Sequence, residues 1–454
     1  MKIVIIGDGK IGSVLAERLS KENHEVTLVD KSGHVLEHTN VDLDIMVVEG
    51  NGATHTVQLE AGADQADLVL ACTGQDELNL LCCLVAKKLG AKHTIARVRN
   101  PEYVGELGLI QDDLGLSMSI NPERECALEM ARVLRFPSAI KIDTFANGRV
   151  EIFKVNIAET SPLNGLFLRE MGQFKAKVLI CAVERGEKDI FIPSGDFCLK
   201  AGDRISFVAS PVEALRFFRQ TGIGRSKVRS AMILGGGRMG YYLASQLMAT
   251  GIDVKIIDHD MARCEELSQL LPNATIICGD GTDQHLLLEE GIEHMDAVVA
   301  LTGIDEENII ISLYARQVTS AKVITKVNRD NYLQIVDRMD LDSVFYPRSI
   351  CADNVVRYVR AMQDSNDFDS METLCKIANG KAEALEFRVR ANSFYCGVPL
   401  QQLKLKSNSL IGCISRDGKL ITPRGGDTIE VGDSVVVVTT HGGMDSLDDI
   451  FETA

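Results

Sequence analysis

Short apolar runs alternate with helix-like segments in two long stretches of the chain. In the first stretch the runs are rich in Val, Ile and Leu, and the segments between them repeat apolar residues at helical spacing. The runs are Ile3–Ile6, Val26–Val29, Ile45–Val48, Leu68–Ala71, Thr94–Val98 and Ser117–Ile120. Strands that alternate with helices of roughly 10–15 residues build a parallel sheet with helices on both faces. The pattern therefore predicts a doubly wound α/β domain of the Rossmann-like type.

The other stretches contain short strands bounded by Gly and Asp. Such strands are typical of a small α+β or β-rich lobe. Asn121 followed by Pro122 has the form of a helix N-cap with proline in the first turn, so a helix is expected to leave the α/β domain and continue to Leu134. Linkers are expected near Phe136–Gly148, Thr221–Ser230 and Asp364–Asp369.

The chain is an internal duplication. Gly7, Gly9, Gly12 and Asp30 recur as Gly235, Gly237, Gly240 and Asp258 at an offset of 228 residues. At an offset of 229 residues, Gly50-Asn51-Gly52 recurs as Gly279-Asp280-Gly281, and Thr73-Gly74 as Thr302-Gly303. A fainter match relates the two β-rich stretches, where Gly202-Asp203 recurs as Gly432-Asp433 at an offset of 230. So many matched positions in one order indicate a repeat.

The repeat predicts two Rossmann-like doubly wound parallel-sheet domains, each followed by a small α+β or β-rich lobe. The expected segments are a first Rossmann domain 1–121, a linker helix 122–148, a first β-rich lobe 149–224, a second Rossmann domain 229–347, a linker helix 348–369 and a second β-rich lobe 370–454.

Charge and cysteine usage narrow the class of protein. Lys and Arg number 48 against 64 Asp and Glu, a net charge of −16, which repels nucleic acid and anionic lipid. The twelve Cys include no CxxC pair, so a reducing cytoplasm is expected. Apolar runs are of strand length, far short of the roughly 20 residues of a membrane-spanning helix, and the first strand begins too early for a signal peptide.

Two histidines have the spacing of a possible metal site. His34 and His38 are four residues apart, as two ligands on one helix face would be, but no third ligand lies near them in sequence. A solvated pair on a surface helix is the favoured interpretation, and no metal is expected.

The strongest chemical signal is a glycine fingerprint that occurs twice. Each copy follows a predicted strand and begins a predicted helix. An acidic residue, Asp30 or Asp258, stands further on at the end of the second strand. The first Gly permits a tight turn, the second lets a pyrophosphate approach the backbone, and the third packs the helix on the strand. The aspartates can accept hydrogen bonds from ribose hydroxyls and would repel a 2′-phosphate. NAD(H) or an adenine nucleotide is therefore expected, with a sheet that has lost its ligand as the alternative.

Further residues are expected at the same crevice. Thr73-Gly74 and Thr302-Gly303 directly follow the fourth strand of each copy. Residues at the carboxyl end of a strand line the crevice, so these residues would contact the ligand. Asn51 and Asp280 could meet the adenine edge or simply form a turn, and Arg97 and Lys326 could pair with phosphate or be surface cations. The expected nucleotide-binding set is Gly7, Asp8, Gly9, Lys10, Ile11, Asp30, Asn51, Thr73, Gly74 and Arg97, with Gly235, Gly236, Gly237, Arg238, Met239, Asp258, Asp280, Thr302, Gly303 and Lys326 in the second copy.

The β-rich lobes offer no evident catalytic set. A dehydrogenase needs a general acid or base beside the nicotinamide, and the only His in these lobes is His441, in a polar Gly-rich stretch. Cofactor domains without catalytic partners favour a sensor. An NAD-dependent oxidoreductase with two cofactor domains is the alternative.

The arrangement resembles the RCK family, cytoplasmic domains that regulate potassium conductance, and in particular the tandem-RCK subunits of bacterial Trk-type uptake systems. The resemblance covers essentially the whole chain and is carried by both glycine fingerprints, by Thr73-Gly-Gln-Asp-Glu-Leu-Asn79 and by Ile95-Ala-Arg-Val-Arg-Asn-Pro-Glu-Tyr103. The second copy departs from the first in having Asn328 where the first has Arg99, and Lys326 where the first has Arg97. This leaves open whether both sites prefer one ligand.

The resemblance implies a non-enzymatic regulatory subunit. The Rossmann domains would be nucleotide-binding N-lobes and the β-rich lobes C-lobes, assembled as a homo-oligomeric ring, a dimer or tetramer. The ring would lie on the cytoplasmic face of a separate potassium-translocating membrane subunit of the Trk or Ktr type, attached through that subunit. NAD(H), or ATP or ADP, would bias its conformation. Regulation of a transporter for another ion stays open.

Overall fold

We analysed a computed structural model of the 454-residue chain. It describes all residues except 34–42, 44, 146–149, 187–188, 224–226, 330–331, 337, 340, 342, 364–370, 378–380, 390–392, 443, 445 and 453–454. The described residues form two compact units, Met1–Ala131 with Arg229–Val356, and Arg132–Val228 with Arg357–Ala454.

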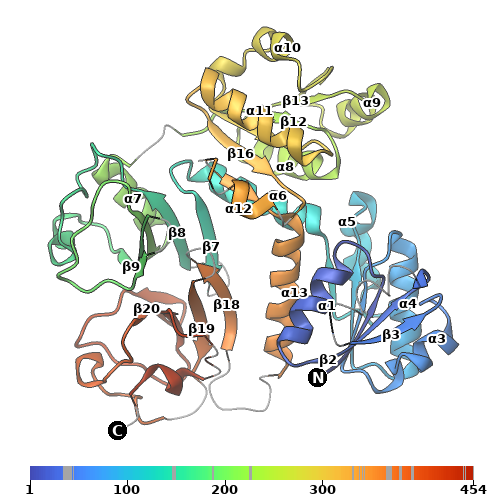
Figure 1. The fold of residues 1–454 in the computed structure, drawn as a ribbon, viewed down its shortest axis with the longest axis horizontal. Coiled ribbons are helices and arrows are strands. Elements are labelled where there is room, and N and C mark those ends of the chain that lie inside the picture. The colour runs from blue at the N-terminus through green and yellow to red at the C-terminus, as the bar shows by residue number, and fades with distance from the viewer. Residues whose placement is uncertain are drawn as a thin grey trace. The chain divides into compact units, whose positions relative to one another are not determined.

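The first unit contains two six-stranded parallel sheets (Figure 1). The first sheet has the order β3-β2-β1-β4-β5-β6 and the second β14-β13-β12-β15-β16-β17, the same doubly wound order in both copies. The strands are β1 Lys2–Ile6, β2 Glu25–Asp30, β3 Met46–Glu49, β4 Leu68–Ala71, β5 His93–Arg97 and β6 Met118–Ile120, then β12 Ser230–Leu234, β13 Asp253–Asp258, β14 Thr275–Cys278, β15 Ala297–Ala300, β16 Lys322–Lys326 and β17 Ser343–Phe345. The prediction of two Rossmann-like sheets is confirmed.

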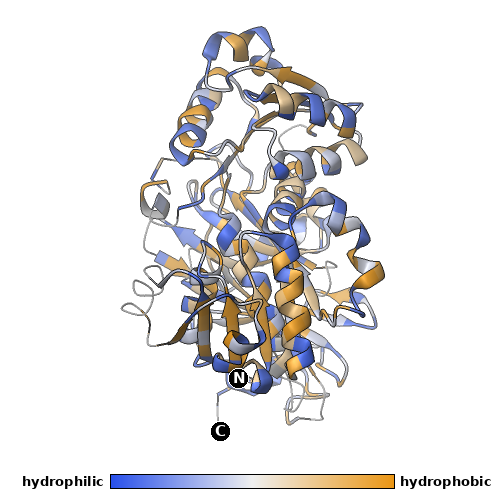
Figure 2. Ribbon diagram, turned by 90° about the vertical axis from the view of Figure 1, so that its right-hand side faces the viewer, coloured by the Kyte–Doolittle hydropathy of each residue, from blue (hydrophilic) through white to orange (hydrophobic). Residues whose placement is uncertain are grey.

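Helices connect these strands. In the first copy they are α1 Gly12–Lys21, α3 His55–Glu60, η1 Ala63–Gln65, α4 Asp76–Leu89, α5 Pro101–Ile110 and α6 Pro122–Arg135. In the second they are α8 Arg238–Ala249, α9 Met261–Leu270, α10 Gln284–Glu289, η4 Ile292–His294, α11 Asp305–Val318, α12 Leu333–Val336 and α13 Pro347–Gln363. Figure 2 shows the strands as largely apolar, while apolar and polar residues alternate around the helices. The helices therefore turn one face to the sheet and one to solvent.

The second unit contains two five-stranded antiparallel sheets. Their orders are β10-β9-β11-β8-β7 and β18-β19-β22-β20-β21. The elements are β7 Lys141–Phe145, β8 Val150–Asn156, η3 Leu168–Gln173, β9 Leu179–Arg185, β10 Asp189–Phe191, β11 Arg204–Ala209 and α7 Pro211–Thr221, then β18 Met371–Ile377, β19 Ala382–Arg388, η7 Leu400–Gln402, β20 Ser409–Arg416, β21 Lys419–Ile421, β22 Ser434–Thr439 and η8 Leu447–Ile450. One core joins side chains of both sheets, among them Phe145, Cys181, Cys375 and Val436.

The helix that leaves the first parallel sheet behaves as its sequence predicts. α6 begins at Pro122, and Asn121 Oδ1 accepts a hydrogen bond from Arg124 N at 2.9 Å. The segment after it differs from the expectation, because Lys141–Phe145 lies inside the predicted linker Phe136–Gly148 and forms strand β7, paired with β8. That linker prediction was wrong over these five residues.

Candidate functional site

The outer glycines of each fingerprint are required by the fold. Gly7 and Gly235 have φ of 104° and 110°, in the left-handed region that favours glycine. A Cβ on Gly12 would lie 1.9 Å from the Gly7 carbonyl oxygen, and one on Gly240 would lie 2.3 Å from that of Gly235. These four positions therefore set the turn and the close packing of α1 and α8 on it.

The middle glycines have no such role. A Cβ on Gly9 or Gly237 would meet no atom within 4 Å. No side chain caps the N-terminus of α1, whose N-cap is Ile11, or of α8, whose N-cap is Gly237. An uncapped helix N-terminus beside open space offers backbone N–H groups and a positive dipole end to an anion. The geometry fits a phosphate or pyrophosphate group.

Residues next to the middle glycines differ in exposure. Lys10 and Arg238 are exposed, so each can reach a bound phosphate from the helix start. Ile11 and Met239 are buried, which assigns them to packing beneath the loop. Asp8 is buried, and the second copy has Gly236 in its place, so the two loops differ in charge.

The aspartates at the ends of β2 and β13 hold the glycine loops in place. Asp30 Oδ2 accepts a hydrogen bond from Asp8 N at 2.8 Å, and Asp258 Oδ2 accepts one from Gly236 N at 2.6 Å. The other oxygen of Asp258 accepts from Asp260 N at 2.9 Å. A carboxylate has about four lone-pair sites, so each aspartate can also accept hydrogen bonds from ribose hydroxyls.

The loop after β4 is held by a buried amide. Asn79 Oδ1 accepts hydrogen bonds from the backbone N and the hydroxyl of Thr73, both at 2.7 Å, and its Nδ2 donates to Arg97 O at 2.8 Å. The second copy repeats this arrangement, with Asn308 Oδ1 accepting from Thr302 N at 2.8 Å. The positions beyond, Gly74 and Gly303, face open space. The loops are therefore fixed at the carboxyl edge of the sheet, facing outward.

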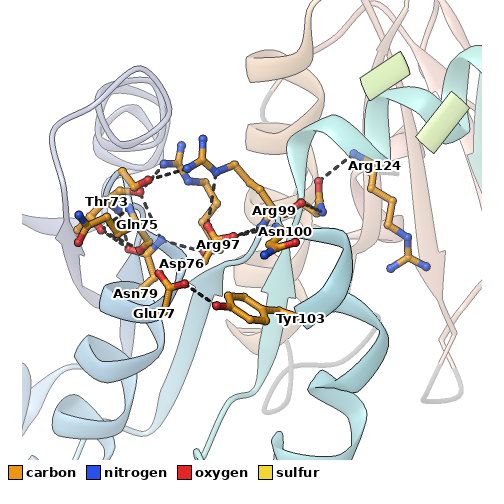
Figure 3. Close-up of polar contacts among 12 residues, drawn as sticks. Thr73, Gln75, Asp76, Glu77, Asn79, Arg97, Arg99, Asn100, Tyr103 and Arg124 are labelled. Atoms are coloured by element: carbon orange, nitrogen blue, oxygen red, sulfur yellow. Dashed lines mark hydrogen bonds and ion pairs between the residues drawn. The ribbon is translucent and has the colours of Figure 1, made fainter. Parts of the chain in front are cut away.

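Two guanidinium groups lie over the first of these loops (Figure 3). Arg97 Nη2 donates to Thr73 O, and Arg99 Nη2 donates to Gly74 O at 2.6 Å. Asp76 Oδ2 accepts from the backbone N of Arg99 at 2.8 Å and fixes the end of β5 beside the loop. The first loop therefore has two guanidinium groups at the sheet edge, of which that of Arg99 is ion-paired with Asp76.

The second loop has one buried cation instead. Lys326 is 9% exposed, and its Nζ donates to Leu301 O at 3.0 Å. Burial lowers the pKa of Lys326, and burial, followed by the charge of Arg99, lowers the pKa of Arg97. The surface-cation interpretation is therefore wrong for Lys326, which supports the loop from within.

The turns after β3 and β14 contain Asn51 and Asp280, for which the sequence allowed either a contact with adenine or a purely structural turn. Asn51 Oδ1 accepts from Ala53 N at 3.1 Å, and Asp280 Oδ1 accepts from Thr282 N at 2.8 Å. These hydrogen bonds make each segment a turn closed by its own side chain. Both side chains are also exposed at the edge where the glycine loop lies.

Three kinds of residue at this edge were missing from the expected set. Asn79 and Asn308 are 229 residues apart, the offset of the repeat, and this recurrence of Asn early in a helix is the signal in the sequence that could have identified them. Arg99 had been noted only as a difference between the copies. Arg263 of α9 donates through Nε to Gly236 O at 2.7 Å, and nothing in its sequence spacing indicated this contact.

Two further observations concern metals and membranes. His34 and His38 lie outside the described residues. Across the part of the chain that is described, no group of three His, Cys, Asp or Glu residues is placed to hold a metal ion.

Within that same part, every helix is too short or too polar to cross a bilayer.

The chain was compared with protein families and with known proteins. The TrkA-N domain model matches residues 3–122 and 231–347, and the TrkA-C domain model matches 152–222 and 384–452. A Trk system potassium uptake protein TrkA homolog of Archaeoglobus fulgidus is 37% identical over 99% of this chain and 100% of its own length. TrkA homolog 1 of Methanosarcina mazei is 34% identical over the full length of both. The solved GsuK channel bound to NAD has a similar fold, with a TM-score of 0.63 and 17% identity over 96% of this chain and 76% of that one.

Fold and site together define a tandem protein with two Rossmann-type domains, each followed by a β-rich lobe. Within that class, family models that cover more than half of the chain and relatives that match its full length agree. The chain belongs to the TrkA family.

Proposed function

We propose that this chain is a nucleotide-binding regulatory subunit of a potassium uptake system, and not an enzyme. The observation that carries the proposal is the pair of open cradles at Gly9 and Gly237, each beside an uncapped helix N-terminus and an aspartate. Support comes from full-length relatives that are named as potassium uptake proteins. Nucleotide occupancy would bias the conformation of the assembly and, through it, potassium flux.

The proposed ligand is NAD(H), with ATP and ADP as competitors for the same cradles. Asp30 and Asp258 carry negative charge where a 2′-phosphate would lie, which disfavours NADP(H). The proposed contact residues are those expected from the sequence, with Arg99 and Arg263 added because they touch the loops. Ile11 and Met239, whose side chains are buried, would contribute through their backbone N–H groups at the helix start. Arg97 and Lys326 would act by holding the loop after the fourth strand, since both donate to its main chain.

The proposed organisation follows the expected segments. Residues 1–121 and 229–347 are taken as N-lobes, 149–224 and 370–454 as C-lobes, and 122–148 and 348–369 as connecting segments. The first connecting segment includes strand β7 as well as its helix.

Self-association is proposed on the basis of exposed apolar side chains at matched places. Leu81 of α4 and Ile310 of α11 occupy equivalent positions of the two copies and are 48% and 65% exposed. On α11, Leu313 is 39% exposed as well and lies three residues after Ile310, so exposed apolar side chains adjoin on this helix, as they do in a protein–protein contact. A homo-oligomer would bury these side chains and attach to the cytoplasmic face of a Trk- or Ktr-type membrane subunit.

The decisive experiment uses the full chain with its membrane partner. The tagged protein is co-purified with the potassium-translocating subunit, and flux is measured in proteoliposomes with NAD, NADH, ATP or ADP. We expect flux to change with nucleotide while the nucleotide is recovered chemically unchanged. Flux independent of all four nucleotides, or oxidation of NADH that depends on an added small substrate, would overturn the proposal.

A further inference from the structure

Two thiols lie beside the aspartate of the second nucleotide cradle. Cys278 is the last residue of β14 and is paired with Asp258 in the parallel ladder. Cys264 belongs to α9, the helix that follows Asp258 in the chain. The two cysteines therefore come from two elements that both lie next to β13.

Both thiols contact the same short piece of backbone. Cys264 Sγ donates to Asp258 O at 3.4 Å, and Cys278 Sγ donates to His259 O at 3.8 Å. Cys264 Sγ also donates to Ile277 O at 3.8 Å, the carbonyl of the peptide bond that leads into Cys278. The Cys264 thiol therefore lies against the backbone on both sides of the β13–β14 pair, next to the residue that precedes Cys278.

The two thiols differ in access to solvent. Cys278 is exposed, whereas Cys264 is buried, and burial raises the pKa of Cys264 to about 11. A reagent in solution therefore meets Cys278 first. Cys264 lies on the protein side of Cys278 and attacks afterwards, once it has lost its proton, so this second step is faster at higher pH.

We propose that Cys264 and Cys278 form a redox-active dithiol whose oxidation weakens nucleotide binding at the second cradle. The oxidant is a low-molecular-weight disulfide, RS–SR. The Cys278 thiolate attacks one of its sulfurs, which forms a mixed disulfide and releases one RS⁻ that takes up a proton. Cys264 then loses its proton and attacks Cys278 Sγ, which releases the second RSH. The two protein thiols are oxidised, and one RS–SR is reduced to two RSH.

Oxidation acts on the cradle through the backbone that both thiols touch. A disulfide has no S–H group, so Asp258 O and His259 O each lose a donor. The new bond also ties α9 to β14 across the turn that carries Asp258. Asp258 already accepts hydrogen bonds from Gly236 N and Asp260 N and must turn its remaining lone pairs to the ribose, and a tied turn resists the adjustment that this needs. This part of the inference rests on the proposed nucleotide site.

The first cradle lacks a cysteine at the position equivalent to Cys278. Glu49 occupies the place of Cys278, paired with Asp30 as Cys278 is with Asp258. Redox sensitivity is therefore confined to the second copy, and the first copy is an internal control.

The dithiol is tested first without any nucleotide. The full chain is equilibrated with reduced and oxidised glutathione and digested without reduction, and its peptides are mapped by mass spectrometry. We expect a Cys264–Cys278 cross-link that is absent in Cys264→Ser and in Cys278→Ser and retained in Cys198→Ser, which removes a partly exposed thiol of the first β-rich lobe. Cys278 found only as free thiol or as a stable glutathione adduct would overturn the dithiol.

The link to the cradle is tested by calorimetry with NADH and with ATP. Gly9→Asp is used as background so that only the second cradle binds. We expect several-fold weaker binding after oxidation and no redox effect when Cys264→Ser and Cys278→Ser are added. Equal affinity in both redox states would overturn the link. No nucleotide binding even in the reduced protein would instead contradict the proposed function, while the cross-link would stand.

Discussion

At the scale of single residues, glycines three positions apart serve different purposes. Gly12→Ala adds a Cβ that would lie 1.9 Å from Gly7 O, whereas Gly9→Ala adds one in open space. We expect Gly12→Ala to destabilise the chain by roughly 1–3 kcal/mol, the range for overpacking, and Gly9→Ala to leave stability nearly unchanged. Urea unfolding followed by circular dichroism measures both. Equal midpoints for the two variants would contradict the assignment of Gly12 to packing.

Asp30 combines a role in the loop with a proposed role in binding. Asp30→Ala removes the acceptor for Asp8 N and for ribose hydroxyls, so NAD(H) or adenine nucleotide affinity should fall by roughly 1–3 kcal/mol, the scale of charge-assisted hydrogen bonds. Calorimetry on this variant, with Asp258→Ala as the matched change in the second copy, makes the measurement. Unchanged affinity in both variants would exclude these carboxylates from the site.

The two cradles are expected to be unequal, with the first dominant. Two arginines lie over the first loop, whereas the second has Lys326, a compact charge that is buried, and Asn328. Gly9→Asp places a Cβ and a negative charge in the first cradle and should abolish most nucleotide binding. Gly237→Asp should have a smaller or ligand-specific effect. Titrations with NADH and ATP compare the variants, and identical losses for both ligands would refute the asymmetry.

At the scale of elements, the parallel sheets were predictable and one strand was not. Runs such as Leu68–Ala71 are apolar on both faces and lie between helical patterns, so periodicity located them. Strand β7 is only five residues long, and its polar Asp143 and Thr144 interrupt the alternation that would mark a strand, so periodicity did not reveal its pairing with β8. The glycine loops were predictable because a tight turn needs particular residues. The contacts of Asn79 and Arg263 depend on how separate elements pack, which one sequence does not reveal.

Each β-rich lobe contains an arginine–aspartate ion pair, called the clasp here, whose aspartate is buried. The repeat in the sequence indicated the aspartate but not the arginine. The repeated Gly-Asp pair ends in Asp203, whose carboxylate accepts two hydrogen bonds from Arg185, through Nε at 2.8 Å and Nη2 at 2.7 Å. Arg416 and Asp433 repeat the pair in the second lobe. Arg185 lies on β9, and the antiparallel pairing of β9 with β11 brings it to Asp203, which directly precedes β11.

Removing this clasp should destabilise the lobe. Asp203→Ala deletes a carboxylate that is 1% exposed, and we expect a loss of about 2 kcal/mol, since Arg185 is partly exposed and can turn to water. Asp196→Ala, which breaks an ion pair with exposed Arg169, is the control and should change little. Urea midpoints of the full chain compare them, and equal midpoints would show that the clasp contributes nothing.

At the scale of the whole molecule, the chain is expected to self-associate. Exposed Leu81 and Ile310 would be covered in an oligomer, so sedimentation at micromolar concentration should show species larger than the 49.6 kDa chain. Ile310→Asp should shift the distribution toward smaller species, because a charge would have to be buried. Val212→Asp, an exposed change in the first β-rich lobe, is the control. A single 49.6 kDa species for the unsubstituted chain would contradict the expectation.

The duplication also changes what mutation can do to this protein. In an assembly of identical single-cradle chains, every codon change appears in all cradles at once, so ligand preference can only drift uniformly. Here one chain contains two cradles. The first copy has Arg99 and Glu49 where the second has Asn328 and Cys278, so the two cradles have already diverged from each other. Because the duplicated domains lie in one chain, each nucleotide site can change by mutation independently of the other. One site can therefore acquire a new sensitivity while the other retains the old one.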